Sequence, residues 1–232
     1  MQKEDFIQRA QKLALTYRAN EQVARQLSKI DLLALVGPTG VGKTTIIEKL
    51  GLPHVLSDVT REMREGEKNG NEYYFRNDYF QIIDEIKSGQ YAQFLVSNSN
   101  EFYGTRITSY PSEGTAVAAI VAAAVPTFRK LGFRKVVPIY ILPPGYKEWM
   151  RRIGTDRAKD FTARMKEAAE SLPMALADPE YRFVLNDDLD FAVSEVRTIM
   201  GGGTISEHRN QLARSSADLL FGRLGVSDDL LL

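Results

Sequence analysis

The 232-residue sequence has no cysteine and only two histidines, His54 and His208. Without cysteine, the chain can form no disulfide bond and offers no thiol nucleophile and no thiolate ligand for a metal. Two histidines this far apart in the chain are too few for an imidazole-based metal site, so a zinc enzyme is disfavoured. We expect structural or surface roles for both.

Net charge and long apolar runs are missing as well. Thirty Lys and Arg residues balance thirty Asp and Glu residues, so the composition predicts neither nucleic acid nor an anionic membrane as the main partner. No segment approaches about 18 consecutive apolar residues, and the charged first 15 residues lack a signal-peptide pattern. We therefore expect a soluble, cytoplasmic protein in which any anion site is local.

The apolar residues change their period along the chain. Helical spacing over residues 1–30 predicts an N-terminal helical extension, and the apolar run at 31–36 predicts a buried parallel strand. Further strands are predicted at 54–56, 72–75, 92–96, 116–122, 136–142 and 181–185, and helices at 44–50, 79–87, 125–131, 159–172 and 189–200. This alternation predicts an α/β core over 31–200, with helices on both faces of a parallel sheet. Three glycines follow, and a C-terminal helical extension is predicted over 204–232.

The sequence GPTGVGKTT, residues 37–45, fits the phosphate-binding pattern G-x-x-x-x-G-K-[ST] and lies between a predicted strand and a predicted helix. Glycines let such a loop curl so that backbone N–H groups and the positive end of the helix dipole face phosphate oxygens. We expect Lys43 to reach the β and γ oxygens of ATP and Thr44 to bind Mg²⁺. The alternative is a glycine-rich turn followed by an ordinary surface lysine. The predicted ATP-binding residues of this loop are Gly37, Pro38, Thr39, Gly40, Val41, Gly42, Lys43, Thr44 and Thr45.

A second motif lies just after the strand predicted at 54–56. Residues 57–75, SDVTREMREGEKNGNEYYF, match S-x-x-T-R-x-x-R-x-G-E-x-x-G-x-x-Y-x-F, the pattern of guanylate kinases at this distance from the loop, at every fixed position. The chain also resembles this family at 102–105 (FYGT for Y-Y-G-[ST]), at Pro143-Pro144 and at 184–190 (VLNDDLD for V-x-N-D-D-L-D). The likeness spans about residues 33 to 199 and leaves both terminal extensions outside.

The resemblance implies a three-layer, parallel-sheet P-loop kinase core with a small acceptor-binding subdomain that contains β-strands, at 57–109, and a helical lid at 145–170. It also implies a nucleoside monophosphate kinase that uses ATP and Mg²⁺ and phosphorylates GMP or a related monophosphate. Two alternatives stay open, a kinase for another phosphate ester such as a phosphosugar and a non-catalytic protein-binding module. Apart from the resemblance, we expect the terminal helices to pack on the kinase core or on a second subunit in a homodimer, with recruitment of another partner as the alternative.

The second motif carries residue types that suit a phosphorylated acceptor. Two arginines three residues apart can clamp a phosphate dianion, while serine and tyrosine add neutral hydrogen bonds. The alternative for REMREGEK, residues 61–68, is an exposed turn of mixed charge. By the resemblance, the acceptor-binding residues are Ser57, Arg61, Arg64, Tyr73, Gln93, Tyr103 and Thr105.

Family members also carry arginines on a mobile segment that closes over the phosphates. Arg151, Arg152, Arg157 and Arg164 occupy the equivalent stretch, and Arg164 fits best. The alternative is a set of arginines on a polar helix face. Asn186 lies where the family contacts the adenine of ATP, although NDDLD is also typical of a helix N-cap. The resemblance gives the catalytic residues as Lys43, Arg61, Arg152 and Arg164.

Two departures from the family pattern concern the acceptor base. Family members have a glutamate, in F-[IL]-E-W, that accepts hydrogen bonds from guanine N1–H and the 2-amino group, whereas this chain has Gln93 in YAQF. An amide that faces two donors leaves a mismatched pair, which costs about 1 to 3 kcal/mol in a dry site. The identity of the acceptor base therefore stays open.

The second departure removes two carboxylates. The family pattern I-L-D-[IV]-D aligns with VAAIV, residues 117–121, so Ala119 and Val121 stand where the family has aspartates that help to recognise the base and order the metal site. Asp84, Glu85 or Glu113 could substitute for them.

Overall fold

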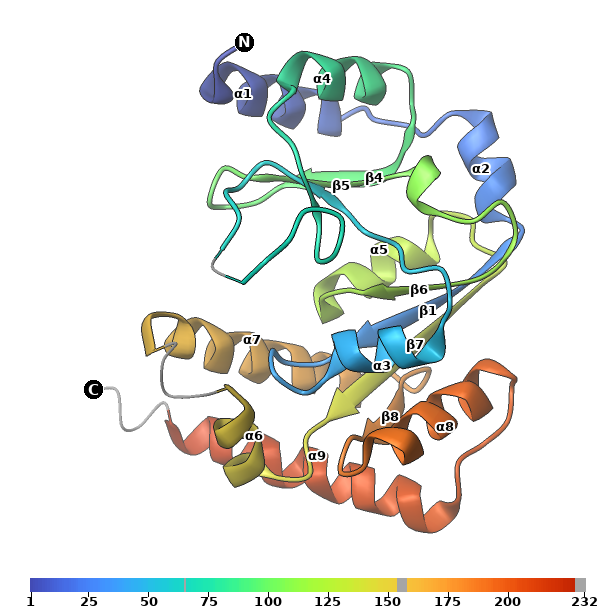
Figure 1. Ribbon diagram of the computed structural model, residues 1–232, viewed down its shortest axis with the longest axis vertical. Helices are drawn as coiled ribbons and strands as arrows, with labels where there is room; N and C mark the ends of the chain where they lie inside the picture. The colour runs from blue at the N-terminus through green and yellow to red at the C-terminus, as the bar shows by residue number, and fades with distance from the viewer. Residues whose placement is uncertain (65, 154–157, 228–232) are drawn as a thin grey trace. The chain divides into compact units, whose positions relative to one another are not determined.

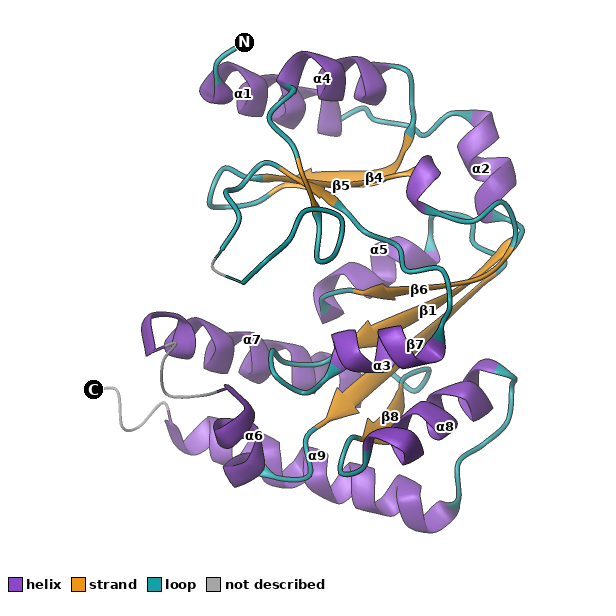
Figure 2. Ribbon diagram, in the orientation of Figure 1, coloured by secondary structure: helices purple, strands orange, loops and turns teal. Residues whose placement is uncertain are grey.

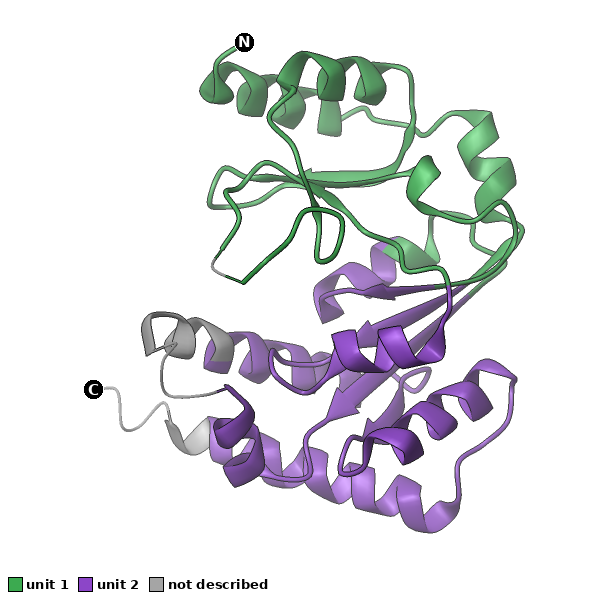
Figure 3. Ribbon diagram, viewed as in Figure 1, with its two compact units in different colours: residues 1–31, 53–116, 128–135 green, residues 32–52, 117–127, 136–232 purple. Residues whose placement is uncertain are grey.

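The computed structural model describes residues 1–64, 66–153 and 158–227 (Figure 1). The chain forms two compact units (Figure 3). Unit 1 comprises residues 1–31, 53–116 and 128–135, and unit 2 comprises residues 32–52, 117–127 and 136–232. The N-terminal helices therefore belong to unit 1 and the C-terminal helix to unit 2.

Unit 1 is a small sheet with helices packed on it. Its elements are α1 (Lys3–Ala14), α2 (Glu21–Leu27), β2 (Asp58–Val59), β3 (Tyr74–Phe75), α4 (Tyr79–Lys87), β4 (Tyr91–Val96), β5 (Phe102–Arg106) and the 3-10 helix η1 (Ile107–Ser109). The strand order is β3-β2-β5-β4, in which β2 pairs in parallel with β3 and antiparallel with β5, and β4 and β5 pair antiparallel. Helix α1 packs against α4 and β4 (Figure 2).

Residues 1–30 contribute directly to the core of unit 1. Phe6, Ile7 and Ala10 recur at helical spacing on α1, and all three are buried against α4 and the sheet. The Phe6 ring stacks on the ring of Tyr79 with centroids 4.8 Å apart. The Tyr17 hydroxyl donates to the backbone carbonyl of Tyr91 at the start of β4. The N-terminal residues therefore pack against β4, the strand that contains Gln93, and stabilise it.

Unit 2 contains the larger sheet. Its elements, some of which begin or end in unit 1, are β1 (Ile30–Val36), α3 (Lys43–Leu50), β6 (Gly114–Ala119), the 3-10 helix η2 (Ala122–Ala124), α5 (Val125–Arg129), β7 (Lys135–Leu142), α6 (Tyr146–Ile153), α7 (Ala158–Ala177), β8 (Arg182–Leu185), α8 (Leu189–Met200) and α9 (Glu207–Ser227). The strand order is β6-β1-β7-β8, and β7 and β8 are parallel. Helix α3 packs against α8, and α9 packs against α7 and β8. No helix in the described part of the chain is both long and apolar enough to span a membrane.

Two of the amphipathic helices have the predicted bounds. Helix α4 covers 79–87 and α8 covers 189–200, as the sequence predicts. The start of α8 is fixed by Asp188, whose carboxylate accepts hydrogen bonds from the backbone N–H groups of Asp190 and Phe191. The N-cap function of NDDLD therefore belongs to Asp188 and not to Asn186.

Some of the predicted strands differ from the strands in the structure. The strand predicted at 54–56 is displaced, because the paired residues of β2 are Asp58 and Val59. The strand predicted at 116–122 ends at Ala119, and η2 follows at Ala122. Strand β5 has no predicted counterpart, whereas α6 lies within the range 145–170 where the family resemblance implies a helical lid. Gly104 interrupts the strand pattern of β5, which forms through its pairing with β2 and β4.

Candidate functional site

Residues 37–45, called the glycine loop below, comprise the connection from β1 to α3 and the first three residues of α3, all in unit 2. Gly37 and Gly42 have φ angles of +137° and +96°, which side-chain-bearing residues rarely adopt. A Cβ atom on Gly37 would lie 2.5 Å from the carbonyl oxygen of Ile141, and one on Gly42 would lie 2.4 Å from Nδ2 of Asn186. Both positions therefore require glycine for conformation and for space.

Side chains from unit 2 hold the loop through its backbone carbonyl oxygens. The Lys43 ammonium donates to the carbonyls of Gly37 and Pro38. The Trp149 indole N–H donates to the carbonyl of Thr39 at 2.8 Å. A fourth carbonyl, that of Val41, accepts from Nδ2 of Asn186 at 2.7 Å. These bonds fix the curl of the loop within the protein alone.

The Lys43 side chain is partly exposed as a whole, but its ammonium end is buried. Burial lowers the pKa of Lys43 to about 8, against a smaller opposing effect from the negative charge of Glu167 on α7. An anion next to this amine would favour its charged form. Thr44 and Thr45, the next residues of α3, are exposed.

Asn186 and Arg152 meet beneath the loop. The Asn186 side chain is buried and contacts the loop through Val41, while Nη2 of Arg152 donates to the Asn186 carbonyl at 3.0 Å. Nε of Arg152 also donates to Glu148 at 2.9 Å. The structure therefore brings together the loop and these two predicted residues, and the Asn186 amide is engaged by the loop backbone.

The structure describes only part of the remaining predicted lid arginines. Arg151 is exposed and forms a two-bond pair with Glu148, at 2.7 Å for both bonds. Arg157 lies outside the described residues. Arg164 belongs to α7, but its side chain is not among those described.

Unit 1 gathers the predicted phosphate-binding side chains around Arg61. The Arg61 guanidinium donates two hydrogen bonds to Glu67, both 2.6 Å, and lies over the ring of Tyr73 at 5.1 Å from its centroid. The Tyr73 and Tyr103 rings meet edge to face with centroids 6.3 Å apart. The hydrogen bond from Arg61 lowers the pKa of Glu67, and burial raises the pKa of Tyr73. The Arg64 side chain is exposed, and its backbone N–H donates to Glu67 at 2.8 Å.

A second cluster in unit 1 joins the other three predicted acceptor residues. Gln93 and Thr105 lie opposite each other in the β4–β5 pair. Nε2 of Gln93 donates to the Thr105 hydroxyl at 3.2 Å, and the Ser57 and Thr105 hydroxyls are 2.9 Å apart. These neutral side chains form one hydrogen-bonded group, in which each hydroxyl can donate or accept.

Charged groups beneath this sheet form a cluster that the sequence analysis does not identify. Asp58 is fully buried and pairs with Arg76 at 2.8 Å and with Arg106 at 2.7 Å. Glu85 accepts from Arg76 at 2.6 Å and from the Tyr91 hydroxyl at 3.1 Å. Buried carboxylates need such partners because an unpaired buried charge is costly. Glu85, predicted as a possible substitute for the missing strand carboxylates, is therefore committed to Arg76 and Tyr91.

Trp149 contacts the glycine loop, and this role is not predicted from the sequence. Its side chain is fully buried, and its indole N–H is the donor to the carbonyl of Thr39. A buried indole N–H needs an acceptor, but the sequence does not indicate which carbonyl provides it.

The chain is similar in sequence to guanylate kinases. The guanylate kinase family model matches residues 29–202. A guanylate kinase from Prochlorococcus marinus is 33% identical over 184 residues, which cover 73% of this chain and 96% of that protein. One from Wolbachia pipientis is 33% identical over 182 residues, covering 73% of this chain and 88% of that protein.

Among solved structures, the crystal structure of guanylate kinase from Anaplasma phagocytophilum matches with a TM-score of 0.55 at 23% identity. The match covers 78% of this chain and 90% of that one, and it supports the predicted α/β P-loop kinase fold. Helix α9 and most of residues 1–30 lie outside the range of the family model.

Proposed function

The chain belongs to the guanylate kinase family, and from this premise we propose that it transfers the terminal phosphate of ATP to GMP with Mg²⁺ as the metal ion. The observation that carries the proposal is the glycine loop, whose carbonyl oxygens are held by Lys43, Trp149 and Asn186. A protein-binding module that transfers no phosphate has no physical need for a loop held in this way. The tethered loop therefore favours the kinase.

The ATP half of the reaction is assigned to unit 2. The absence of Cβ atoms at Gly37 and Gly42 permits the curl that turns backbone N–H groups toward phosphate oxygens. Lys43 then balances charge on the β and γ oxygens, and an ATP phosphate replaces the loop carbonyls as its partner. The exposed hydroxyl of Thr44, at the start of α3, fits an oxygen ligand for Mg²⁺, which when bound offsets charge on the transferred group.

The acceptor half is assigned to unit 1. Arg61 exchanges Glu67 for the phosphate of the acceptor, because the fork of a guanidinium fits phosphate and carboxylate oxygens alike. The hydroxyls of Ser57, Tyr73 and Tyr103 orient the same phosphate, and Gln93 and Thr105 are assigned to the base. These residues bind and orient, and the arginine charge stabilises the transition state.

The transfer step moves one phosphoryl group. An oxygen of the GMP phosphate forms a bond to the γ phosphorus of ATP, while the bond from that phosphorus to the β–γ bridging oxygen breaks. The products are GDP and ADP. Arg152 and Arg164 are proposed to stabilise the charge that develops on the transferred group.

A coupled assay of ADP release with GMP, dGMP, AMP, UMP and CMP tests the proposal, with Lys43→Met as the background control. We expect turnover with the guanine nucleotides above that with the other monophosphates. Wild-type protein that turns over none of the five contradicts the kinase assignment. Calorimetry with Mg-ATP then separates an inactive ATP-binding protein from a module that binds no nucleotide.

A further inference from the structure

Helix α9 lies beyond the range of the family model and is nevertheless built into unit 2. Its buried face comprises Ala213, Ala217, Leu220 and Leu224, which belong to the main apolar core. The helix packs against α7 and β8. It therefore has the contacts to act on the segment that follows β8, where Asn186 lies.

Arg209, near the start of α9, makes a set of hydrogen bonds to that segment. Its guanidinium donates to both carboxylate oxygens of Asp187, at 2.7 and 2.9 Å, and to the carbonyl of Leu185 at 3.0 Å. Nε donates to Glu195 of α8 at 2.7 Å. The Arg209 side chain is only 19% exposed, so these bonds are partly shielded from water. Arg209 thus binds the residues on both sides of Asn186.

Asn186 in turn contacts the glycine loop. Its backbone N–H donates to the carbonyl of Leu142 at the end of β7, at 2.8 Å. Its side-chain amide donates to the carbonyl of Val41, and the same nitrogen occupies the space that a Cβ atom on Gly42 would need. A shift of the Leu185–Asp187 segment would therefore move a group that defines the shape of the loop.

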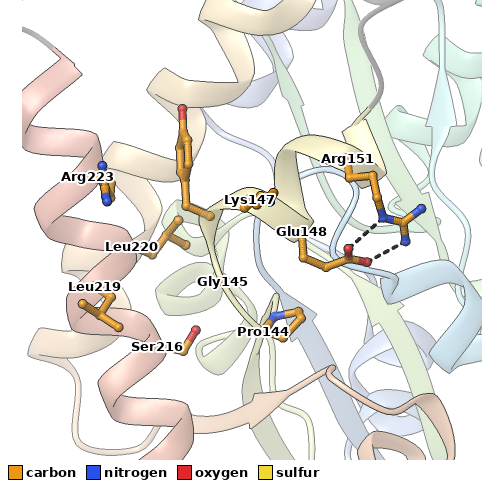
Figure 4. Close-up of a pocket in the computed structure, with 10 residues that line it drawn as sticks. Pro144, Gly145, Lys147, Glu148, Arg151, Ser216, Leu219, Leu220 and Arg223 are labelled. Atoms are coloured by element: carbon orange, nitrogen blue, oxygen red, sulfur yellow. Dashed lines mark hydrogen bonds and ion pairs between the residues drawn. The ribbon is translucent and has the colours of Figure 1, made fainter.

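A second link joins α9 to the loop by another route. The buried Ser216 hydroxyl donates to the carbonyl of Pro143 at 2.9 Å, just before α6, whose Trp149 donates to the loop. Figure 4 shows this part of the molecule, where a cavity of about 730 Å³ lined by α6 and α9 includes Pro144 and Ser216 in its wall. The Arg209 link is the better defined of the two because it uses several charged bonds.

We propose that Arg209 is a positioning residue for the ATP site, acting through Asn186 on the glycine loop. By binding Leu185 and Asp187 it keeps the Asn186 amide against Val41 and so maintains the curl that receives phosphate. Arg209 itself touches no substrate. The inference rests on the proposed function, since it concerns the affinity for ATP.

The test compares Arg209→Met with the matched control Arg214→Met on the same helix. Arg214 lies over the ring of Phe183 at 5.8 Å and is exposed. We expect Arg209→Met to weaken Mg-ATP binding by roughly 3- to 30-fold, measured by calorimetry at 10 °C, and to raise KM for ATP similarly. KM for GMP and both constants of Arg214→Met should stay within about twofold of wild type, the scatter expected of surface changes.

A double-mutant cycle with Asn186→Ala tests the route. If Arg209 acts through Asn186, adding Arg209→Met to Asn186→Ala should weaken ATP binding little further. Arg209→Lys, which keeps the charge but loses the fork, should fall between wild type and Arg209→Met and remains informative if the methionine variant does not fold.

Two results of the kinetic and melting experiments would overturn the inference, in addition to the two binding results given below. One is a lower melting temperature with unchanged ATP affinity, which would make Arg209 purely structural, and the other is an equal rise in KM for ATP and GMP. Wild-type protein that binds no Mg-ATP removes the proposed function together with the inference. Wild-type binding with no change in either Arg209 variant removes the inference alone.

Discussion

In unit 2 the candidate ATP loop is held through its backbone carbonyls, whereas in unit 1 the candidate phosphate-binding guanidinium of Arg61 is held by a carboxylate. The loop bonds to Lys43, Trp149 and Asn186 leave its N–H groups outside these contacts. The bonds of Arg61 to Glu67 use the same donors that a phosphate would need. One site is shaped in advance, and the other must exchange an internal partner for its ligand.

This difference between the glycine loop and the Arg61 site predicts which substitutions should weaken ligand binding at each site. A preformed loop depends on backbone conformation and on the residues beneath it, so distant contacts affect its affinity. A site in which Glu67 competes for Arg61 depends on the balance between two anions, because the carboxylate must give up two short bonds. Binding of the acceptor should therefore respond to side-chain chemistry more than to backbone geometry.

Lys43→Ala should have the largest effect on activity. The change removes the positive charge that we propose balances the β and γ oxygens of ATP, and kcat should fall about 100- to 1,000-fold. The matched control is Lys49→Ala, on the same helix, where the lysine forms an exposed pair with Asp190. Steady-state kinetics and a thermal melt check the result. Full activity in Lys43→Ala would show that the glycine loop is not the catalytic loop.

Arg61→Met should weaken binding of the acceptor GMP and leave the binding of ATP unchanged. Loss of the charged hydrogen bonds to phosphate should raise KM for GMP by up to about 100-fold, with KM for ATP within about twofold. Arg25→Met is the control, because Arg25 forms an exposed pair with Glu21 on α2 of the same unit. An equal rise in both KM values would mean that Arg61 supports the fold of unit 1 through Glu67 and does not bind the acceptor.

The sequence predicts well those parts of the fold in which a local pattern decides the structure. Helix α8 has an apolar stripe and an Asp188 cap, and both its bounds are correct. Strand β5 escapes prediction because Gly104 weakens its pattern and its hydrogen bonds come from β2 and β4. Pairing partners that are distant in sequence leave no local signal.

The same distinction applies to the site. The motif residues Ser57, Gln93 and Thr105 are named from the sequence, and the structure places them in one hydrogen-bonded group. The groups that hold the loop, such as the Trp149 indole, could not be assigned because their acceptors are backbone carbonyls. Any carbonyl within reach serves as an acceptor, so only the tertiary structure identifies the one that is used.

Gln93→Glu tests whether unit 1 reads the base at this position. The Thr105 hydroxyl can donate to a carboxylate as readily as it accepts from the amide, so the local hydrogen bond survives the change. Relative to AMP, kcat/KM for GMP should rise about tenfold or more, because a carboxylate accepts from both guanine donors. Gln90→Glu, in the exposed turn before β4, adds the same charge as a control. An unchanged ranking of bases would place base recognition elsewhere.

The smallest predicted effect is the pH dependence that the Lys43 amine gives to the stability and the ATP affinity of unit 2. Between the Lys43 pKa of about 8 in the folded protein and its ordinary value of 10.5, the unfolded chain binds more protons, so the lysine's contribution makes the free protein more stable as pH rises through this window. ATP binding has the opposite sign, because phosphate favours the charged amine and must draw a proton from solvent. The affinity for Mg-ATP should fall about tenfold between pH 7 and 9.

Calorimetry of Mg-ATP binding at pH 9, in two buffers with different ionisation enthalpies, measures this uptake directly. We expect close to one proton per ATP in the wild type, because an amine with a pKa of about 8 is mostly neutral at this pH. Lys43→Met should bind ATP more weakly and take up none. The same binding enthalpy in both buffers for the wild type would mean that Lys43 is already charged in the free loop. In that case burial would not have lowered its pKa, and the loop would be prepared for phosphate in charge as well as in shape.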